Sequence, residues 1–224
     1  MRKGGFTLAE VLITLGIIGV VAAVTIPTLM TNIKAVKLKS QFLKAHSTVL
    51  QAYKMMEAED VSTVLEDYTD SKTFYRTFMR YFQGTHDCGT SGDSTTQKYL
   101  PCYYPYGDKG YKTLGGVSAS YTNFDDGQFA LPNGSLILVE NFQGSLWVSV
   151  DINGFNNKPN IWGVDLFTFD VLDGGLVPMG STGTAYLEDY CNKDNADSKN
   201  GIGCTKQAID DPDYFKKVVK DLKL

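Results

Sequence analysis

An apolar stretch near the N-terminus is the strongest pattern in the chain. Hydrophobic residues fill positions 6–30 almost without interruption, and Glu10 is the only ionisable residue among them. A helix over these 25 residues is roughly 37 Å long at about 1.5 Å per residue, enough to cross a membrane core of about 30 Å. A carboxylate in hydrocarbon costs a few kcal/mol unless it has a partner. The pattern therefore predicts a membrane-spanning helix with one functional carboxylate.

Beyond this stretch the pattern becomes amphipathic. Apolar residues recur at steps of three and four along residues 31–60: Phe42, Ala45, Val49, Ala52 and Met56. This spacing places their side chains on one face of a helix. We therefore expect the first helix to continue to about residue 59 and to pack its apolar face against a globular part of the chain.

The remaining residues predict a second helix and a sheet. Residues 70–83 carry phenylalanines on one helical face, and Gly84 follows as a stop signal. Residues 92–120 resemble a loop rich in tyrosine, glycine and proline. Strand patterns follow at residues 129–131, 135–140, 146–150 and 166–171. A Pro-Asn-Gly turn joins the first two strands, so the sequence predicts an α+β fold in which an antiparallel sheet packs on the second half of the long helix.

The residues before the apolar stretch carry a second signal. Two basic residues precede Gly4-Gly5, and Phe6 begins the apolar stretch. A secretory signal peptide has a shorter apolar region of about 7–15 residues and a small-residue cleavage site after it, neither of which is found here. The run from Gly5 to Glu10 resembles the class III leader junction of type IV pilins and of the pseudopilins of type II secretion systems. Gly19, Ala22-Ala23 and Ile26-Pro27 extend the resemblance over the first thirty residues.

The resemblance implies a processing pathway and a domain order. A prepilin peptidase would cut between Gly5 and Phe6 and methylate the new amino group of Phe6. Residues 1–5 would be the leader, 6–30 the transmembrane and polymerisation helix, 31–60 its continuation on the head, and 61–224 a pilin-like extracytoplasmic head. The subunit would cross the bacterial inner membrane once, with its N-terminus in the cytoplasm. An inner-membrane assembly platform would then add it to a helical polymer of pilin or pseudopilin subunits.

Three residues of the apolar stretch would act in assembly. In the family, the carboxylate at Glu10 pairs with the N-terminal amine of a neighbouring subunit, and an unmatched buried charge is strongly penalised. The stretch between Gly19 and Pro27 would lose helix when subunits pack. Simpler readings remain open: Glu10 would extend its carboxylate to the membrane surface, and Pro27 would only kink a helix that the membrane tolerates.

The sequence gives conflicting signals about the side of the membrane on which the C-terminal part lies. Four lysines follow the apolar stretch and two basic residues precede it, so a count of positive charges alone would place the C-terminal part in the cytoplasm. The leader junction and the cysteines argue for the opposite orientation. Disulfides persist outside the cytoplasm, and sequence proximity favours two local pairs: Cys88 with Cys102, and Cys191 with Cys204. The second pair also resembles the bounded loop of many type IV pilins. Four free thiols are the alternative.

Composition and motifs place the head among non-catalytic domains. The chain of 224 residues is 43% hydrophobic and 21% charged, which suits one globular domain. A net charge of −4 provides no basic footprint for nucleic acid. There are two histidines and no recognisable hydrolase, phosphate-binding or zinc-protease motif. We therefore expect a structural filament subunit that needs no cofactor, of a type IV pilus or a type II secretion pseudopilus. The alternative is a membrane-anchored extracytoplasmic binding protein or enzyme that forms no filament.

One loop carries a candidate metal site. Asp151 and Asn153 precede a glycine, and Asp165 ends the same polar excursion, so their oxygens resemble part of a Ca²⁺ loop. The loop lacks the third alternating ligand and the final glutamate of an EF-hand. A hairpin turn capped by aspartate side chains is the favoured alternative.

Overall fold

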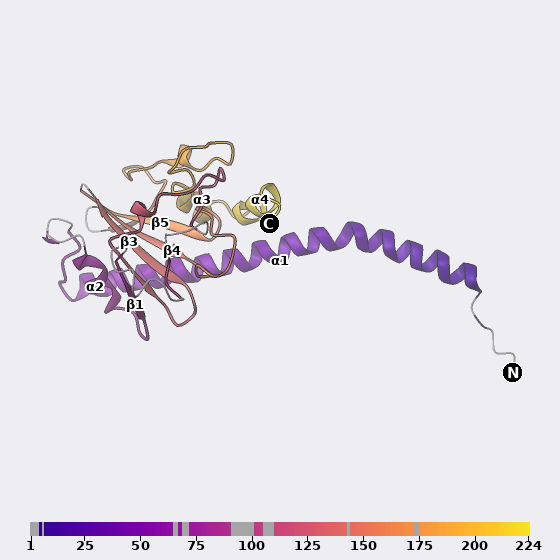
Figure 1. The fold of residues 1–224 in the computed structure, drawn as a ribbon, viewed down its shortest axis with the longest axis horizontal. Helices are drawn as coiled ribbons and strands as arrows, with labels where there is room; N and C mark the ends of the chain where they lie inside the picture. The colour runs from indigo at the N-terminus through magenta and orange to yellow at the C-terminus, as the bar shows by residue number, and fades with distance from the viewer. Residues whose placement is uncertain are drawn as a thin grey trace.

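A single long helix and a globular head make up the molecule. The computed structural model describes residues 5, 7–64, 67–68, 72–90, 101–104, 110–142, 144–172 and 175–224. Helix α1 (Leu8–Ala58) is 51 residues long and curves gently away from the head (Figure 1). Its first half projects alone, and its second half lies along the head. The predicted α+β fold with a long N-terminal helix is confirmed.

The head is built on one antiparallel sheet. The described residues contribute six strands to it, which follow one another in chain order, each hydrogen-bonded to the next: β1 (His86–Gly89), β2 (Gly127–Ala130), β3 (Leu136–Phe142), β4 (Ser145–Asp151), β5 (Leu166–Leu172) and β6 (Gly175–Pro178). Strands β2 to β5 lie where the sequence predicts strands, with bounds that differ by at most two residues. Strands β1 and β6, four residues each, were not predicted.

The helices of the head are short. In the part of the head that the structure describes, they are α2 (Thr73–Met79), α3 (Cys204–Asp210) and α4 (Tyr214–Asp221), with 3₁₀ turns η2 (Tyr121–Asn123) and η3 (Glu188–Tyr190). The helix predicted over residues 70–83 was too long, and residues 70–71 lie outside the described part. It ends early because Tyr81 and Phe82 donate their N–H groups to carbonyls only three residues back, which tightens the chain into turns. Helices α3 and α4 were not predicted.

Two apolar clusters lie on opposite faces of the sheet. Alternation along β3 sends Ile137 and Val139 into the first cluster and Leu136 and Leu138 into the second. The first cluster joins the sheet to α1, α2 and α4, and α4 packs against α1 where that helix leaves the head (Figure 1). The second cluster is rich in aromatic rings and contains Trp162. The predicted apolar face of α1 is thus covered by the head.

Candidate assembly helix and head sites

The first half of α1 presents apolar side chains to its surroundings. Large apolar residues from Leu8 to Ile33 are between 42% and 81% exposed, and the first buried residue of the helix is Ala35. Among the described residues, α1 is the one helix long and apolar enough to cross a membrane. Exposed apolar surface on this scale marks a site of membrane or protein contact. The apolar surface of this half of α1 therefore needs a membrane or another protein to bury it, because the head of the same chain does not.

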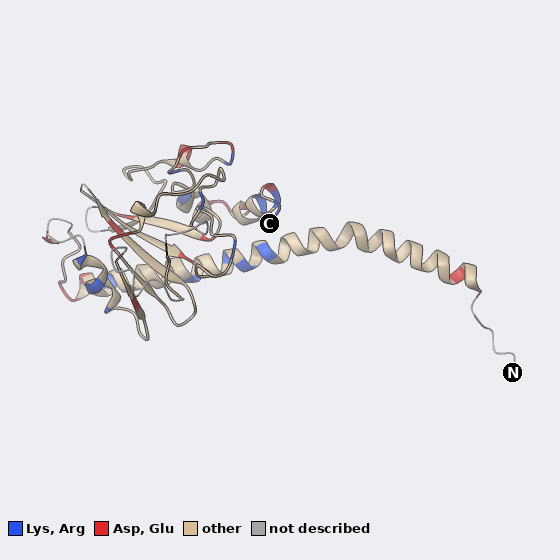
Figure 2. Ribbon diagram, in the orientation of Figure 1, with Lys and Arg blue, Asp and Glu red and all other residues tan. Residues whose placement is uncertain are grey.

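Glu10 is the only charged residue of α1 before Lys34 (Figure 2). Its Oε2 accepts hydrogen bonds from the backbone N–H and the hydroxyl of Thr7, both at 2.8 Å, and its own N–H donates to Thr7 Oγ1 at 3.2 Å. This reciprocal arrangement is a capping box, which satisfies N–H groups that have no partner in the first turn. The role of Thr7 was missed, although its signal, threonine three residues before glutamate, is visible in the sequence.

The other predicted assembly residues lie within or just before α1. The helix runs without a break through Gly19 and Pro27. A Cβ atom at Gly19 would have no neighbour within 4 Å, so packing inside this chain does not require glycine there. Gly5 is likewise in open space. The predicted leader residues 1–4 and Phe6 lie outside the described part of the chain.

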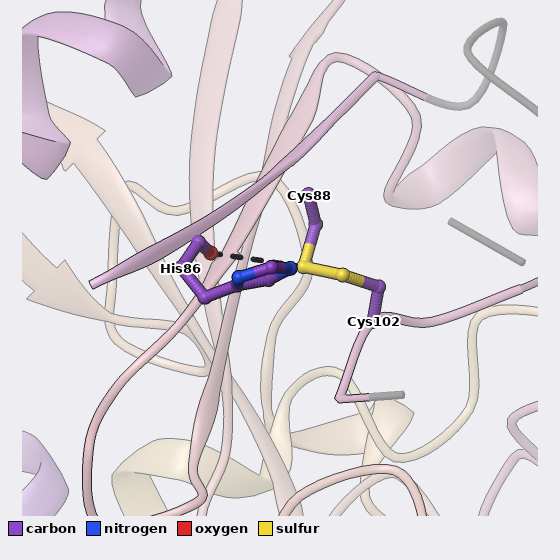
Figure 3. A group of neighbouring side chains, drawn as sticks. All are labelled: His86, Cys88 and Cys102. Carbon is purple, nitrogen blue, oxygen red and sulfur yellow. Dashed lines mark hydrogen bonds between the residues drawn. A yellow bond between two sulfur atoms is a disulfide. The ribbon is translucent and has the colours of Figure 1, made fainter. Parts of the chain in front are cut away.

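Both cysteine pairs are local disulfides. Cys88 bonds Cys102, with Cα atoms 5.6 Å apart, and Cys191 bonds Cys204, with Cα atoms 4.8 Å apart. His86 lies beside the first disulfide, and Figure 3 shows its ring close to the sulfur atoms. A metal-binding cysteine needs a free thiolate, and both sulfurs here are joined to each other. This group of three residues is therefore part of a covalent clip between β1 and the chain near Cys102.

The predicted Ca²⁺ loop connects β4 to β5. Asp151 is fully buried: its Oδ1 accepts from the N–H groups of Asn153 and Gly154, at 3.2 and 2.8 Å, and its Oδ2 from the hydroxyl of Tyr111 at 2.8 Å. Asp165, also fully buried, accepts from two backbone N–H groups at 2.7 and 2.8 Å. Burial raises the pKa of Asp151 to about 8, helped by the nearby Asp165, and raises the pKa of Asp165 to about 6.

The hydrogen bonds to the carboxylates of this loop are those of a turn capped by aspartate side chains. Every carboxylate oxygen of Asp151 and Asp165 already accepts a hydrogen bond from the protein. The Asn153 amide nitrogen donates to the carbonyls of Asn157 and Lys158, and its Oδ1 is buried without a partner among the described residues. These contacts close the loop by themselves. Calcium binding at Asp151, Asn153 and Asp165 stays a prediction.

Comparison with known proteins gives a match at the N-terminus. Residues 1–26 match the family model described as the prokaryotic N-terminal methylation motif. No curated protein and no solved structure matches the chain. The motif match covers the start of α1, including Glu10 and Gly19, and carries no information about the head.

Proposed function

The chain carries in residues 1–26 the signature of type IV pilins and pseudopilins, and from this premise we propose that it is a structural subunit of a helical filament. In this proposal prepilin peptidase cuts between Gly5 and Phe6 and methylates Phe6. The mature subunit waits in the bacterial inner membrane, with its head outside the cytoplasm, until the assembly platform extracts it. The observation that carries the proposal is the methylation motif at the start of an otherwise uncovered apolar helix.

The exposed half of α1 supports assembly through that helix. Side chains that are 42–81% exposed between Leu8 and Ile33 lie in hydrocarbon before assembly and against the helices of neighbouring subunits afterwards. Head-to-tail contacts of this kind do not close into a ring when each subunit is also displaced along an axis, and they then produce a helical filament. The open space around Gly19 fits a glycine whose role lies in contacts between chains or in local loss of helix near Pro27.

Glu10 has two roles in this proposal. Within the chain it closes the capping box with Thr7, and this contact holds the carboxylate at the end of α1 that carries the new amine of Phe6. Between chains it pairs with the amine of a neighbouring subunit. Breaking a buried ion pair by removing one partner costs about 3–5 kcal/mol, so a subunit without the charge should be excluded from the polymer.

The head outside the cytoplasm is supported by the two disulfides, since such bonds persist in oxidising compartments. Two filaments remain candidates: a surface pilus and a short type II secretion pseudopilus. Subunits recovered from filaments sheared off the cell would favour the pilus. Loss of protein secretion on deletion, with no sheared filaments, would favour the pseudopilus.

The processing step is tested by mass spectrometry of the N-terminus of protein recovered from its native membrane. We expect a chain that starts at methylated Phe6, and Gly5→Ala should leave the leader in place. An intact Met1, or a cut after the apolar stretch, would refute the proposal.

The two roles of Glu10 are separated by a matched pair of variants. Glu10→Gln keeps an acceptor that suits a capping box but removes the charge, whereas Thr7→Val removes the hydroxyl that accepts from the Glu10 N–H and keeps the charge. We expect Glu10→Gln to be cleaved normally and to assemble at least about 100-fold less, as a cost of about 3–5 kcal/mol for an unpaired amine implies, and Thr7→Val to assemble. Normal assembly of Glu10→Gln together with failure of Thr7→Val would show that the carboxylate acts only as a cap.

A further inference from the structure

A lysine and an asparagine that are far apart in the sequence meet in the head. Lys199 Nζ donates a hydrogen bond to Asn123 Oδ1, and the two residues are 76 positions apart. Asn123 is 3% exposed and ends η2, whereas Lys199 is half-buried in the loop between Cys191 and Cys204. An amine is a nucleophile when it is neutral, and here it contacts the carbonyl of a side-chain amide. These are the two groups that an amide bond between side chains requires.

Backbone contacts hold both side chains in place. The N–H of Lys199 donates to Asp197 Oδ1 at 2.7 Å, and the carbonyl of Lys199 accepts from the N–H of Ile202 at 3.1 Å. On the other side, Asn123 Nδ2 donates to the carbonyl of Ser120 at 2.9 Å, which fixes the plane of the amide. Groups held in contact before a reaction avoid much of the entropic cost of meeting. The two side chains are therefore preorganised to react with each other.

Two aromatic rings lie beside the amine. Lys199 Nζ is 5.1 Å from the ring centroid of Trp147 and 5.8 Å from that of Tyr186. The rings attract a cation but do not neutralise it, and none of the ion pairs among the described residues includes Lys199. Burial lowers the pKa of Lys199, because the ammonium group is poorly solvated there. The neutral, nucleophilic amine is therefore more accessible than on an exposed lysine.

A pair of carboxyl groups near the amine can move protons. Glu140 is the cross-strand partner of Trp147, and its charge acts on Lys199. The side chain and the backbone of Asp125 both hydrogen-bond to Glu140. Burial, with the Asp125 carboxyl against it, raises the pKa of Glu140 to about 8, so the two carboxyls share one proton at neutral pH. Such a pair contains one carboxylate that accepts a proton and one carboxylic acid that donates a proton.

We propose that Lys199 and Asn123 form an intramolecular amide bond, and that the Glu140–Asp125 pair moves the protons. The Lys199 ammonium gives a proton to the pair, and the lone pair of its nitrogen then attacks Cγ of Asn123. Two protons pass in total from this nitrogen to Nδ2 through the pair. The Cγ–Nδ2 bond breaks with its electron pair on Nδ2, and one ammonium ion leaves. Charge is conserved, nothing is oxidised or reduced, and no co-reactant is needed.

The amide bond would change the head in two ways. It removes a half-buried positive charge, which is costly to desolvate, because the amide product is neutral. It also ties the loop between Cys191 and Cys204 to η2, and a covalent link between distant residues restricts the unfolded chain as a disulfide does. Neither effect depends on the proposed filament function.

The test is intact-mass spectrometry of the full chain, purified in detergent micelles and reduced so that the disulfides do not affect the mass. The natural chain should be lighter by one ammonia than its sequence requires, with any leader cleavage and methylation taken into account. A succinimide at an Asn-Gly pair causes the same loss of mass. A tryptic digest therefore has to locate the bond, and we expect a branched peptide that joins Asn123 to Lys199.

Matched variants separate the reacting amine from its surroundings. Lys199→Arg keeps a cation beside Trp147 but stays protonated, so it should have the full mass. Lys193 lies exposed in the same loop and pairs with Asp194, and Lys193→Arg should keep the amide bond. Glu140→Gln should slow bond formation at least about tenfold, measured as the share of branched peptide in a time course of expression. Near-ultraviolet circular dichroism verifies that each variant is folded.

A natural chain with the full mass would overturn the proposal, because Lys199 would then be only a hydrogen-bonded cation beside two rings. A loss of ammonia that persists in Lys199→Arg would do the same, because it would assign the loss to a succinimide at a site such as Asn153-Gly154. Unchanged bond formation in Glu140→Gln would refute the role given to the carboxyl pair.

Discussion

Phe42 is a buried residue of α1 that packs against aromatic rings of two elements of the head. It is 1% exposed, and its ring centroid lies 4.5 Å from that of Phe167 in β5 and 5.5 Å from that of Phe215 in α4. The rings of Phe167 and Phe215 are themselves 5.8 Å apart. Three elements that are distant in the sequence therefore meet at one aromatic cluster. Phe42→Ala would leave a cavity at the centre of this contact.

The size of the effect follows from the burial. Replacing a buried phenylalanine with alanine costs about 3–5 kcal/mol. A domain of about 150–250 residues loses about 2–4 °C of unfolding temperature per kcal/mol, so we expect Phe42→Ala to lower the unfolding temperature by roughly 6–20 °C. Leu43, the next residue of the same helix, is 48% exposed. Leu43→Ala should change stability by no more than about 0.5 kcal/mol.

The assay is thermal unfolding of the full-length protein in detergent micelles, followed by near-ultraviolet circular dichroism, which reports the aromatic packing. Both variants should keep the helical far-ultraviolet signal at low temperature. Equal effects of Phe42→Ala and Leu43→Ala would refute the reasoning, because the two positions would then be equally buried. A loss below about 1 kcal/mol for Phe42→Ala would mean that the head does not depend on α1 for its core.

Two further predictions concern the head. Replacing Cys191 and Cys204 together with serine should cost on the order of 3 kcal/mol, because the disulfide closes a short loop, and an unfolding temperature unchanged under oxidising conditions would contradict this. His46 lies between the rings of Phe42 and Phe169, at centroid distances of 6.2 and 5.3 Å, and burial lowers its pKa. The unfolded chain therefore binds the proton more readily, so stability should fall as the pH drops below about 6.5. Urea titrations at several pH values should show that His46→Gln weakens this pH dependence, and an identical slope in both proteins would argue against it.

The long helix and the central strands were predictable because their signals are local and repeated. The apolar stretch and the three-and-four spacing that follows it each extend over several turns, and α1 ends at Ala58, one residue from its predicted end. Strands β3, β4 and β5 have seven residues each and alternate clearly. Their β-branched and aromatic residues fit a sheet buried on both faces.

The elements that were missed depend on contacts distant in the sequence. Helix α4 is eight residues long, too short to be stable by helix propensity alone. The Tyr214 hydroxyl donates to the carbonyl of Gly163 at 2.5 Å, and Phe215 enters the core beside Phe42. Strand β1 has an irregular register against β2 between Asp87 and Gly89, so its alternation is broken. Tertiary packing therefore determines the secondary structure of these segments, and the sequence pattern alone was too weak to predict it.

The candidate sites also divide into those with a local sequence signal and those that depend on contacts distant in the sequence. Glu10 was identified from the sequence because a charge inside an apolar stretch is visible without any structure. The proximity of Asp125, Asp126 and Glu140, whose carboxylate oxygens lie within 4.8 Å of one another, was not predicted, although the turn at residues 132–134 was. Once that turn centres the hairpin, the register pairs Ala130 with Leu136 and Gly127 with Val139, and the acidic residues follow on both strands. Predicting this proximity requires the β2–β3 register to be followed from the turn to the other end of the hairpin. An error of one residue in that register would have placed Glu140 on the opposite face of the sheet.

The lysines after the apolar stretch bear on the orientation proposed for the chain. A count of positive charges places them in the cytoplasm, but the fold gives them other partners. Lys39 Nζ donates to the carbonyl of Pro212 at 3.0 Å, and Lys34 and Lys37 line a groove of about 640 Å³ together with Lys158 of the β4–β5 loop. These lysines therefore belong to the surface of a folded head. Because long domains are translocated largely regardless of charge, their number is weak evidence against a head outside the cytoplasm, whereas two disulfides in that head favour it.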